Sequence, residues 1–267
     1  MPHSKQVYQR RELLLNEPTN VVLGVERSNV VSGGTSNAII ASTGSTIRDY
    51  PYAYTGAYAL NSTILGSKDC FIWGAEGSAV LGATSSSIQA PDMTNQQSYS
   101  VILGGFSNII WTEQLGYNAI LGGWGNRMSG VTSNSTLVGG VVNAIRGDSN
   151  TSIILGGSSH LIDLASDSSI IAGGSEHDIA TGWRSAIIGG ANNRIANSNW
   201  STMVGGILNT IDGFDNVTMI NCIAKTATQA GSTYVNNLVL ADYVPTSATG
   251  LQVGHVWRNG TVLNVVV

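Results

Sequence analysis

The feature that most constrains this chain is an internal repeat in which a glycine returns every 16 to 18 residues. Each copy has a Ser or Asn, then aliphatic residues, then a Gly that is usually followed by a second Gly or a small residue. In the most regular copies the first glycines are Gly104, Gly122, Gly139, Gly156, Gly173, Gly189 and Gly205, with spacings of 18, 17, 17, 17, 16 and 16 residues. A period of this length is typical of a solenoid, in which each repeat forms one coil.

The repeat is itself built from two halves of eight residues. Gly66, Gly74 and Gly82 are eight residues apart, and Gly130 follows Gly122 by the same distance in a later copy. A few aliphatic residues favour a short strand, and a glycine permits the positive φ of a sharp corner. We therefore expect an all-β fold, a parallel β-solenoid or β-roll. Its 16–18-residue coils would each contain two octads and stack at about 4.8 Å.

Four positions after the first glycine, every regular copy carries a polar residue. The set is Asn108, Asn126, Asn143, His160, His177, Asn193 and Asn209. We expect one column in which side-chain amides bond to their neighbours above and below, as in an Asn ladder. His160 and His177 are interpreted as substitutes for Asn. The alternative is a metal or anion site on a trimer axis, where two histidines per chain converge as six; the ladder explains the spacing without it, so no metal is predicted.

Composition excludes several classes of function. Charged residues are only 10% of the chain and the net charge is −4, without a basic run, so nucleic acid is not an expected partner. Low charge also fits a surface that is partly hidden between subunits. No apolar stretch approaches about 18 residues, so membrane insertion is not expected. Cys70 and Cys222 are interpreted as buried core residues, and no cofactor is predicted.

The chain is expected to have four parts. Residues 1–19 form an N-terminal attachment or cap segment, and residues 20–99 form irregular coils with inserted loops at 45–61 and 89–99. Residues 100–221 form the regular rod. Residues 222–267 form a C-terminal β cap, in which Asn259 and Gly260 are expected to turn a hairpin between strands near Trp257 and Leu263.

Two stretches carry a family resemblance. The segments NAILGG at 118–123 and SAIIGGANNRI at 185–195 are similar to the head repeats of trimeric autotransporter adhesins, which also occur in phage tail fibres. The resemblance implies a left-handed β-roll and an intertwined or side-by-side homotrimer. Residues 243–265 resemble the ends of phage tail and virion structural proteins. The chain lacks both a secretion signal and a C-terminal membrane barrel, so the phage branch is favoured.

Binding is expected on loops and exposed aromatic residues, because insertions between coils map to the surface. The receptor-binding candidates are Tyr50, Tyr52, Tyr54, Tyr58, Trp111 and Tyr117. Tyrosine and tryptophan rings suit contact with a host cell-surface glycan or protein. The competing interpretation is that these rings, with Trp183 and Trp200, pack against a neighbouring subunit.

The sequence thus predicts a structural fibre of a phage virion, a tail fibre or spike involved in host attachment. It would be assembled in the host cytoplasm, bind other virion proteins through one end, and not be an enzyme. One alternative is a polysaccharide-degrading tailspike, which needs two carboxylates about 5–10 Å apart; the close acidic pairs are Asp163/Asp167, Glu176/Asp178 and Asp212/Asp215. Another is a trimeric bacterial surface adhesin. An ice-binding solenoid is disfavoured because Thr-x-Thr ranks are missing.

Overall fold

The computed structural model describes residues 21–23, 30–32, 36–49, 59–90, 99–112, 116–236, 247, 249–250, 252, 256–259 and 262–265. The chain divides into two compact units, Met1–Tyr234 and Val235–Val267. Every regular element in the described ranges is a β-strand. No helix among them is long and apolar enough to cross a membrane. The predicted all-β class is confirmed.

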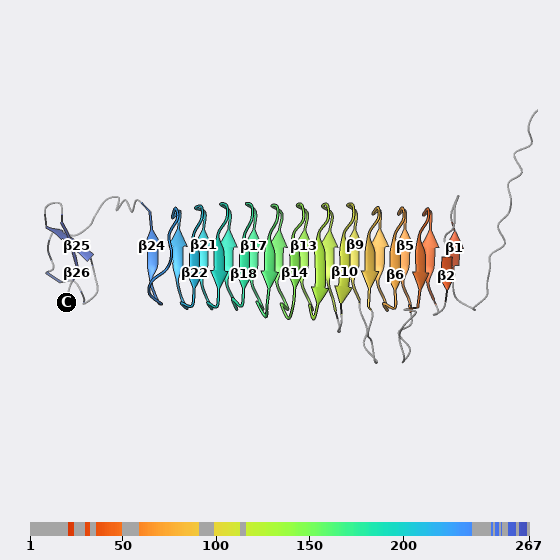
Figure 1. Ribbon diagram of the computed structural model, residues 1–267, viewed down its shortest axis with the longest axis horizontal. Helices are drawn as coiled ribbons and strands as arrows, with labels where there is room; N and C mark the ends of the chain where they lie inside the picture. The colour runs from red at the N-terminus through yellow and green to blue at the C-terminus, as the bar shows by residue number, and fades with distance from the viewer. Residues whose placement is uncertain are drawn as a thin grey trace, which may run out of the picture. The chain divides into compact units, whose positions relative to one another are not determined.

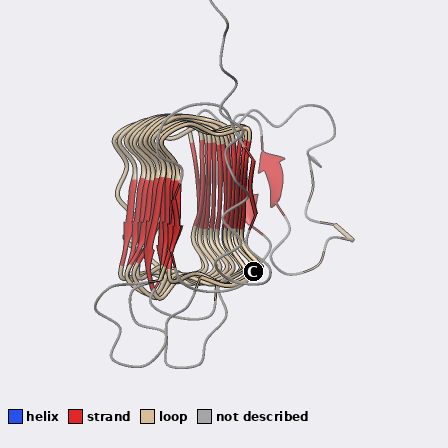
Figure 2. Ribbon diagram, turned by 90° about the vertical axis from the view of Figure 1, so that its right-hand side faces the viewer, coloured by secondary structure: helices blue, strands red, loops and turns tan. Residues whose placement is uncertain are grey.

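In the first unit each coil contributes one strand to each of two parallel sheets, which face each other across the core (Figures 1 and 2). The thirteen described strands of sheet A are β1 (Val21–Leu23), β3 (Ala38–Ile40), β5 (Thr63–Leu65), β7 (Ala79–Leu81), β9 (Val101–Leu103), β11 (Ala119–Leu121), β13 (Thr136–Val138), β15 (Ile153–Leu155), β17 (Ile170–Ala172), β19 (Ala186–Ile188), β21 (Thr202–Val204), β23 (Thr218–Ile220) and β24 (Thr233–Val235). The eleven of sheet B are β2 (Val30–Ser32), β4 (Thr46–Arg48), β6 (Phe71–Trp73), β8 (Ser87–Gln89), β10 (Ile109–Thr112), β12 (Arg127–Gly130), β14 (Ala144–Arg146), β16 (Leu161–Asp163), β18 (Asp178–Ala180), β20 (Arg194–Ala196) and β22 (Thr210–Asp212). The predicted parallel β-solenoid is confirmed.

Successive coils are in register, so equivalent residues lie above one another. In sheet A, Ile102 pairs with Ile120, and Ile120 pairs with Leu137. In sheet B, Ile145 pairs with Ile162. These central strand residues are fully buried, and the two aliphatic columns meet between the sheets. Burial of each such side chain contributes about 1.5–3 kcal/mol, so a coil gains its stability only by stacking on the next.

The first corner, which leads from sheet A to sheet B, depends on two glycines with different roles. Gly104 has a φ of +69°, and an added Cβ would meet nothing within 4 Å. Gly105 has a φ of +83°, and an added Cβ would lie 2.4 Å from Asn108 Nδ2 and 2.4 Å from the Gly123 carbonyl oxygen. Gly104 is therefore needed for its positive φ, whereas Gly105 is needed both for its positive φ and for the space that the ladder side chain occupies.

The residue that follows the first glycine of this corner depends on the size of the ladder residue. Coils with Asn or His in the ladder have a glycine with positive φ at this place. In the earlier coils Ala83 accompanies Ser86, and Ser67 accompanies Cys70, without a positive φ at either corner residue. A small ladder side chain thus removes the need for glycine, because it does not occupy the space beside the corner.

The boundaries of the regular solenoid differ from those predicted. Strand β4 lies within the predicted insertion 45–61, and Ile47 fills the same core column as Ile72. Complete coils are already present in 59–90, before the predicted start of the rod at residue 100. At the other end β24 adds a strand of sheet A within the predicted cap. An insertion between coils hides the period in the sequence without disturbing the column on either side of it.

The second unit contains the predicted hairpin, formed by β25 (Val256–Asn259) and β26 (Val262–Val265) in antiparallel pairing. Asn259 pairs with Val262, and Trp257 pairs with Asn264. Asn259 therefore belongs to a strand and not to the turn, which corrects the predicted Asn259–Gly260 turn.

Candidate self-association surface

The outer face of sheet A is apolar along the whole described sheet. Two residues of each three-residue strand point outward, and from β3 to β23 all of them are Ala, Val, Leu, Ile or Thr. The most exposed of these are 37–47% exposed, which is high for large aliphatic side chains: Leu65, Leu103, Leu121, Leu155, Ile170, Ile188, Val204 and Ile220. A repeated apolar surface of this extent marks an interaction site. This surface could have been predicted from the sequence, because the two strand residues that flank each buried residue carry no charge. The sequence prediction did not include it.

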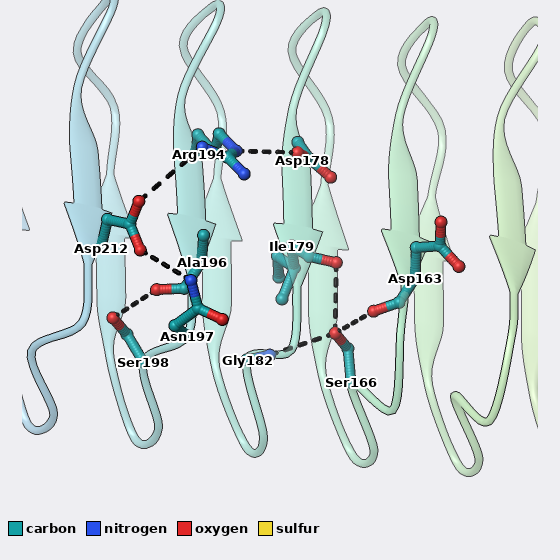
Figure 3. A network of polar contacts seen from close by, with 10 residues as sticks. All are labelled: Asp163, Ser166, Asp178, Ile179, Gly182, Arg194, Ala196, Asn197, Ser198 and Asp212. Carbon is teal, nitrogen blue, oxygen red and sulfur yellow. Dashed lines mark hydrogen bonds and ion pairs between the residues drawn. The ribbon is translucent and has the colours of Figure 1, made fainter.

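Sheet B presents the opposite chemistry on its outer face. Arg146 Nε lies 2.8 Å from Asp163 Oδ2. Arg194 Nε lies 3.1 Å from Asp178 Oδ2 (Figure 3). Arg194 also approaches Asp212 at 4.0 Å. Burial raises the pKa of Asp178, while the hydrogen bond and the charge of Arg194 oppose that rise. Exposed pairs of this kind contribute about 0–1 kcal/mol each, so they keep this face hydrated more than they stabilise the fold.

The acidic residues considered for a tailspike reaction make structural contacts. Asp163 and Asp178 are in the ion pairs above, and Asp212 Oδ1 accepts a hydrogen bond from Asn197 at 2.8 Å (Figure 3). At the second corner, which leads from sheet B back to sheet A, Asp167 accepts the Asn150 N–H at 2.6 Å. Each of these four carboxylates therefore contacts a residue of a neighbouring coil.

The first corner extends the apolar surface at two places. Phe106 and Trp124 are 46% and 52% exposed on neighbouring coils, and Ile207 and Ile223 are 46% and 60% exposed near the other end. Val142 is half exposed with a φ of +55°. A β-branched residue is disfavoured in this left-handed conformation, which the equivalent residues Ser159 and Asn192 of other coils share.

The ladder residues are at most 1% exposed and lie inside the solenoid. In the first six ladder residues, the side-chain acceptor (Oδ1 of Asn or Nδ1 of His) receives the backbone N–H of the ladder residue in the next coil. Asn126 N–H donates to Asn108 Oδ1 at 3.0 Å, and His177 N–H donates to His160 Nδ1 at 3.2 Å. The side chains thus serve backbone donors at the corner, where no sheet partner is present. One amide–amide bond of the expected kind is present, from Asn209 Nδ2 to Asn193 Oδ1 at 3.0 Å. In the earlier coils the amide Nδ2 donates instead to a glycine carbonyl of the next coil, as at Asn108, Asn126 and Asn143.

The two histidines stack inside the column and do not face outward. Because Nδ1 of each ring accepts a backbone N–H, Nε2 carries the proton, and it points toward a glycine carbonyl of the next coil without a regular hydrogen bond. Burial, and after it the nearby His177, lower the pKa of His160 to about 4. Burial also lowers the pKa of His177. Rings buried in this way cannot converge on an axis between chains, so the six-histidine site is not formed.

The predicted binding residues are placed as follows. Trp111 is 38% exposed on the outer face of sheet B, and Tyr117 is 56% exposed at the second corner, stacked on Tyr99 at 5.4 Å. These positions belong to different parts of the coil. Tyr50, Tyr52, Tyr54 and Tyr58 lie outside the described residues.

No family model matches the sequence, and no curated protein matches it. One match among solved structures is the "Crystal Structure of the polySia specific acetyltransferase NeuO", with 10% identity and a TM-score of 0.15, over 83% of this chain and 84% of that one. Because the matched protein is an enzyme, the prediction that this chain is not an enzyme is contradicted and is withdrawn. A TM-score of this size carries no argument about a reaction or a site.

Proposed function

We propose that the chain is a structural fibre of a bacteriophage virion, a tail fibre or spike in which three copies associate through the outer face of sheet A. The observation that carries the proposal is the uncharged and largely apolar outer surface that continues from β3 to β23. The virion assignment and the number three rest on the resemblance of 118–123, 185–195 and 243–265 to fibre and virion proteins.

The partner for this surface is a second copy of the chain. The surface repeats with every coil from β3 to β23, so the partner has to offer matching apolar residues at the same interval. Another copy of the same solenoid does so. A partner with an unrelated fold would match only part of the length.

The size of the surface suits a stable contact. At about 4.8 Å per strand, the eleven strands from β3 to β23 extend about 50 Å, and three residues give a width of about 10 Å. The projected area is about 500 Å², and the exposed apolar residues of the first corner add to it. The sum approaches the roughly 800 Å² per partner of a standard interface.

Attachment to a host surface is the role that we propose for the rest of the molecule. The outer face of sheet B and the second corner stay available when the sheet A faces meet, because the outer faces of the two sheets lie on opposite sides of the solenoid (Figure 2). The exposed aromatic residues Tyr117, Trp183 and Trp200 lie at the second corner.

The mass of the protein in solution tests the proposal. Sedimentation equilibrium should give three times 27.8 kDa, and a monomer at micromolar concentration contradicts it. A labelled antibody against the chain should bind the tail of intact phage particles in electron micrographs. Binding to the surface of uninfected bacteria, with no signal on particles, would assign the chain to the bacterial adhesin alternative.

A further inference from the structure

Two tryptophans form an exposed aromatic pair at the second corner. The ring centroids of Trp183 and Trp200 are 5.5 Å apart with planes inclined by 51°, and the side chains are 38% and 46% exposed. The guanidinium of Arg184 lies over the Trp183 ring, 4.2 Å from its centroid. The pair belongs to two successive coils, one leading into β19 and the next into β21.

The solenoid does not require aromatic residues at these places. The equivalent positions of neighbouring coils hold polar residues: Ser133, Asn134, Asn150, Thr151, Asp167, Ser168, Asn199, Asp215 and Asn216. The position of Trp200 has a left-handed backbone in each of these coils, with φ of +49° at Trp200 and +54° at Asn134. Asn tolerates this conformation, whereas a bulky residue is an outlier in it. An exposed tryptophan in an unfavourable conformation points to binding.

Polar groups are fixed beside the pair. Asn199 Oδ1 accepts the backbone N–H of Trp183 at 3.1 Å, and Asp215 Oδ1 accepts the backbone N–H of Asn199 at 2.7 Å. The two rings, inclined to each other by 51°, are therefore flanked by the Asn199 amide and the Asp215 carboxylate, which accept backbone N–H groups of the corner. The Arg184 guanidinium is placed by its contact with the Trp183 ring. This is the chemistry that recognises a sugar ring, since a pyranose offers an apolar C–H face and hydroxyl groups around its rim.

The geometry of the coil also suits a chain of sugars. Coils repeat at about 4.8 Å, close to the length of one pyranose in a linear glycan. Residues Asn134, Thr151 and Ser168 continue the same corner as a polar row, and the stacked pair Tyr99 and Tyr117 lies beyond them. Successive sugar rings would thus meet successive coils.

We propose that the second corner around Trp183 and Trp200 binds a linear saccharide, with the tryptophans stacking on sugar rings and with Arg184, Asn199 and Asp215 bonding to their substituents. This inference rests on the proposed role in host attachment and names its ligand class. A second copy of the chain is a less suitable occupant. Contact between copies repeats on every coil, whereas the tryptophans occupy two coils and are surrounded by polar residues.

The test uses the full chain on an array of bacterial O-antigen and capsular saccharides, followed by fluorescence titration with the strongest array ligand. We expect saturable quenching of tryptophan emission and at least tenfold weaker binding for W183A/W200A. The control is W111A, which removes a tryptophan of equal exposure, 38%, from the outer face of sheet B; its affinity should stay within twofold. Circular dichroism confirms that the variants are folded.

Three outcomes would overturn the inference. They are no array saccharide bound above the level of W183A/W200A, an equal loss in W111A, and a smaller assembly mass for W183A/W200A, which would make the pair a subunit contact. Mass is measured on the same samples, so the two proposals fail separately. A trimer without saccharide binding contradicts the site alone, and a monomer with saccharide binding contradicts the fibre alone.

Discussion

The imidazole rings of His160 and His177 stack face to face, with centroids 4.9 Å apart and planes 2° from parallel. Both rings accept a backbone N–H at Nδ1, so protonation of Nδ1 would set two N–H groups against each other. Protonation of both rings would also place two positive charges within the column. The charged residues nearest in sequence, Asp163, Glu176 and Asp178, lie on the outer face or at the exposed corner and do not enter the core.

The stack therefore makes the solenoid sensitive to acid. The pKa of His160 is lowered to about 4 from 6.5, so the unfolded chain binds more protons between these values. Stability is complete above pH 6.5 and is lost as the pH falls toward 4, by about 3 kcal/mol for His160. H160N/H177N restores the residue type of the other ladder positions. Its melting temperature should fall less than that of the wild type between pH 7 and pH 4. Parallel curves for the two proteins would contradict this account.

The two corner glycines should differ in their response to alanine. G104A adds strain at a positive φ but meets no atom, and should cost about 1–2 kcal/mol. G105A also collides with Asn108 and the Gly123 carbonyl, and should cost about 3 kcal/mol or more. The measurement is the melting temperature by circular dichroism. G105A/N108S should recover part of the loss, because Ala83 and Ser86 show that this pair of residues is compatible with the fold. Equal costs for the two single variants would contradict the steric explanation.

A charge on the outer face of sheet A should dissociate the assembly. Leu155 is 45% exposed on β15, and L155E would place a carboxylate among apolar residues of a neighbouring copy, which is costly without a partner. Sedimentation should give a mass of 27.8 kDa for the variant. The matched control is S129E on the outer face of sheet B, which should keep the mass of the wild type. A change in S129E with none in L155E would assign the contact to the other sheet.

Cys70 should be inert in the folded protein. The thiol is fully buried, donates to the Lys68 carbonyl at 3.3 Å, and has its pKa raised by burial. A thiol reagent at pH 8 should label it only after unfolding. C70S should change the melting temperature little, since Ser45 and Ser86 occupy the same column in adjacent coils. Rapid labelling of the native protein would show that the coil opens locally.

The period could be predicted from the sequence because each residue of a coil has one environment, and a repeated environment selects a repeated residue type. The buried column through Ile120 and the corner glycines followed directly from that. The bonding of Asn108 could not be predicted, because spacing places a side chain in a column without showing that a backbone N–H is its partner. The strand Thr46–Arg48 was missed because an insertion after it broke the spacing by which the coils were recognised.

The candidate surface was missed for a different reason. The sequence prediction was made from the buried residue of each strand, such as Ile154. It did not include the outward neighbours Ile153 and Leu155. Their apolar character cannot come from the core, since they point away from it. The tryptophans were noticed as a group, but the conformation of Trp200 and its distance from Trp183 appear only in the structure.

Because successive coils stack in register, the length of the solenoid is set by the number of coils. Each coil bonds only to the coils beside it, through the same columns, so removing or duplicating a segment of 16 or 17 residues between equivalent positions leaves every remaining contact unchanged. Such an event, which recombination between similar stretches of DNA readily produces, would alter the length in steps of about 4.8 Å. The length of the solenoid can therefore change by whole coils, independently of the residues outside it.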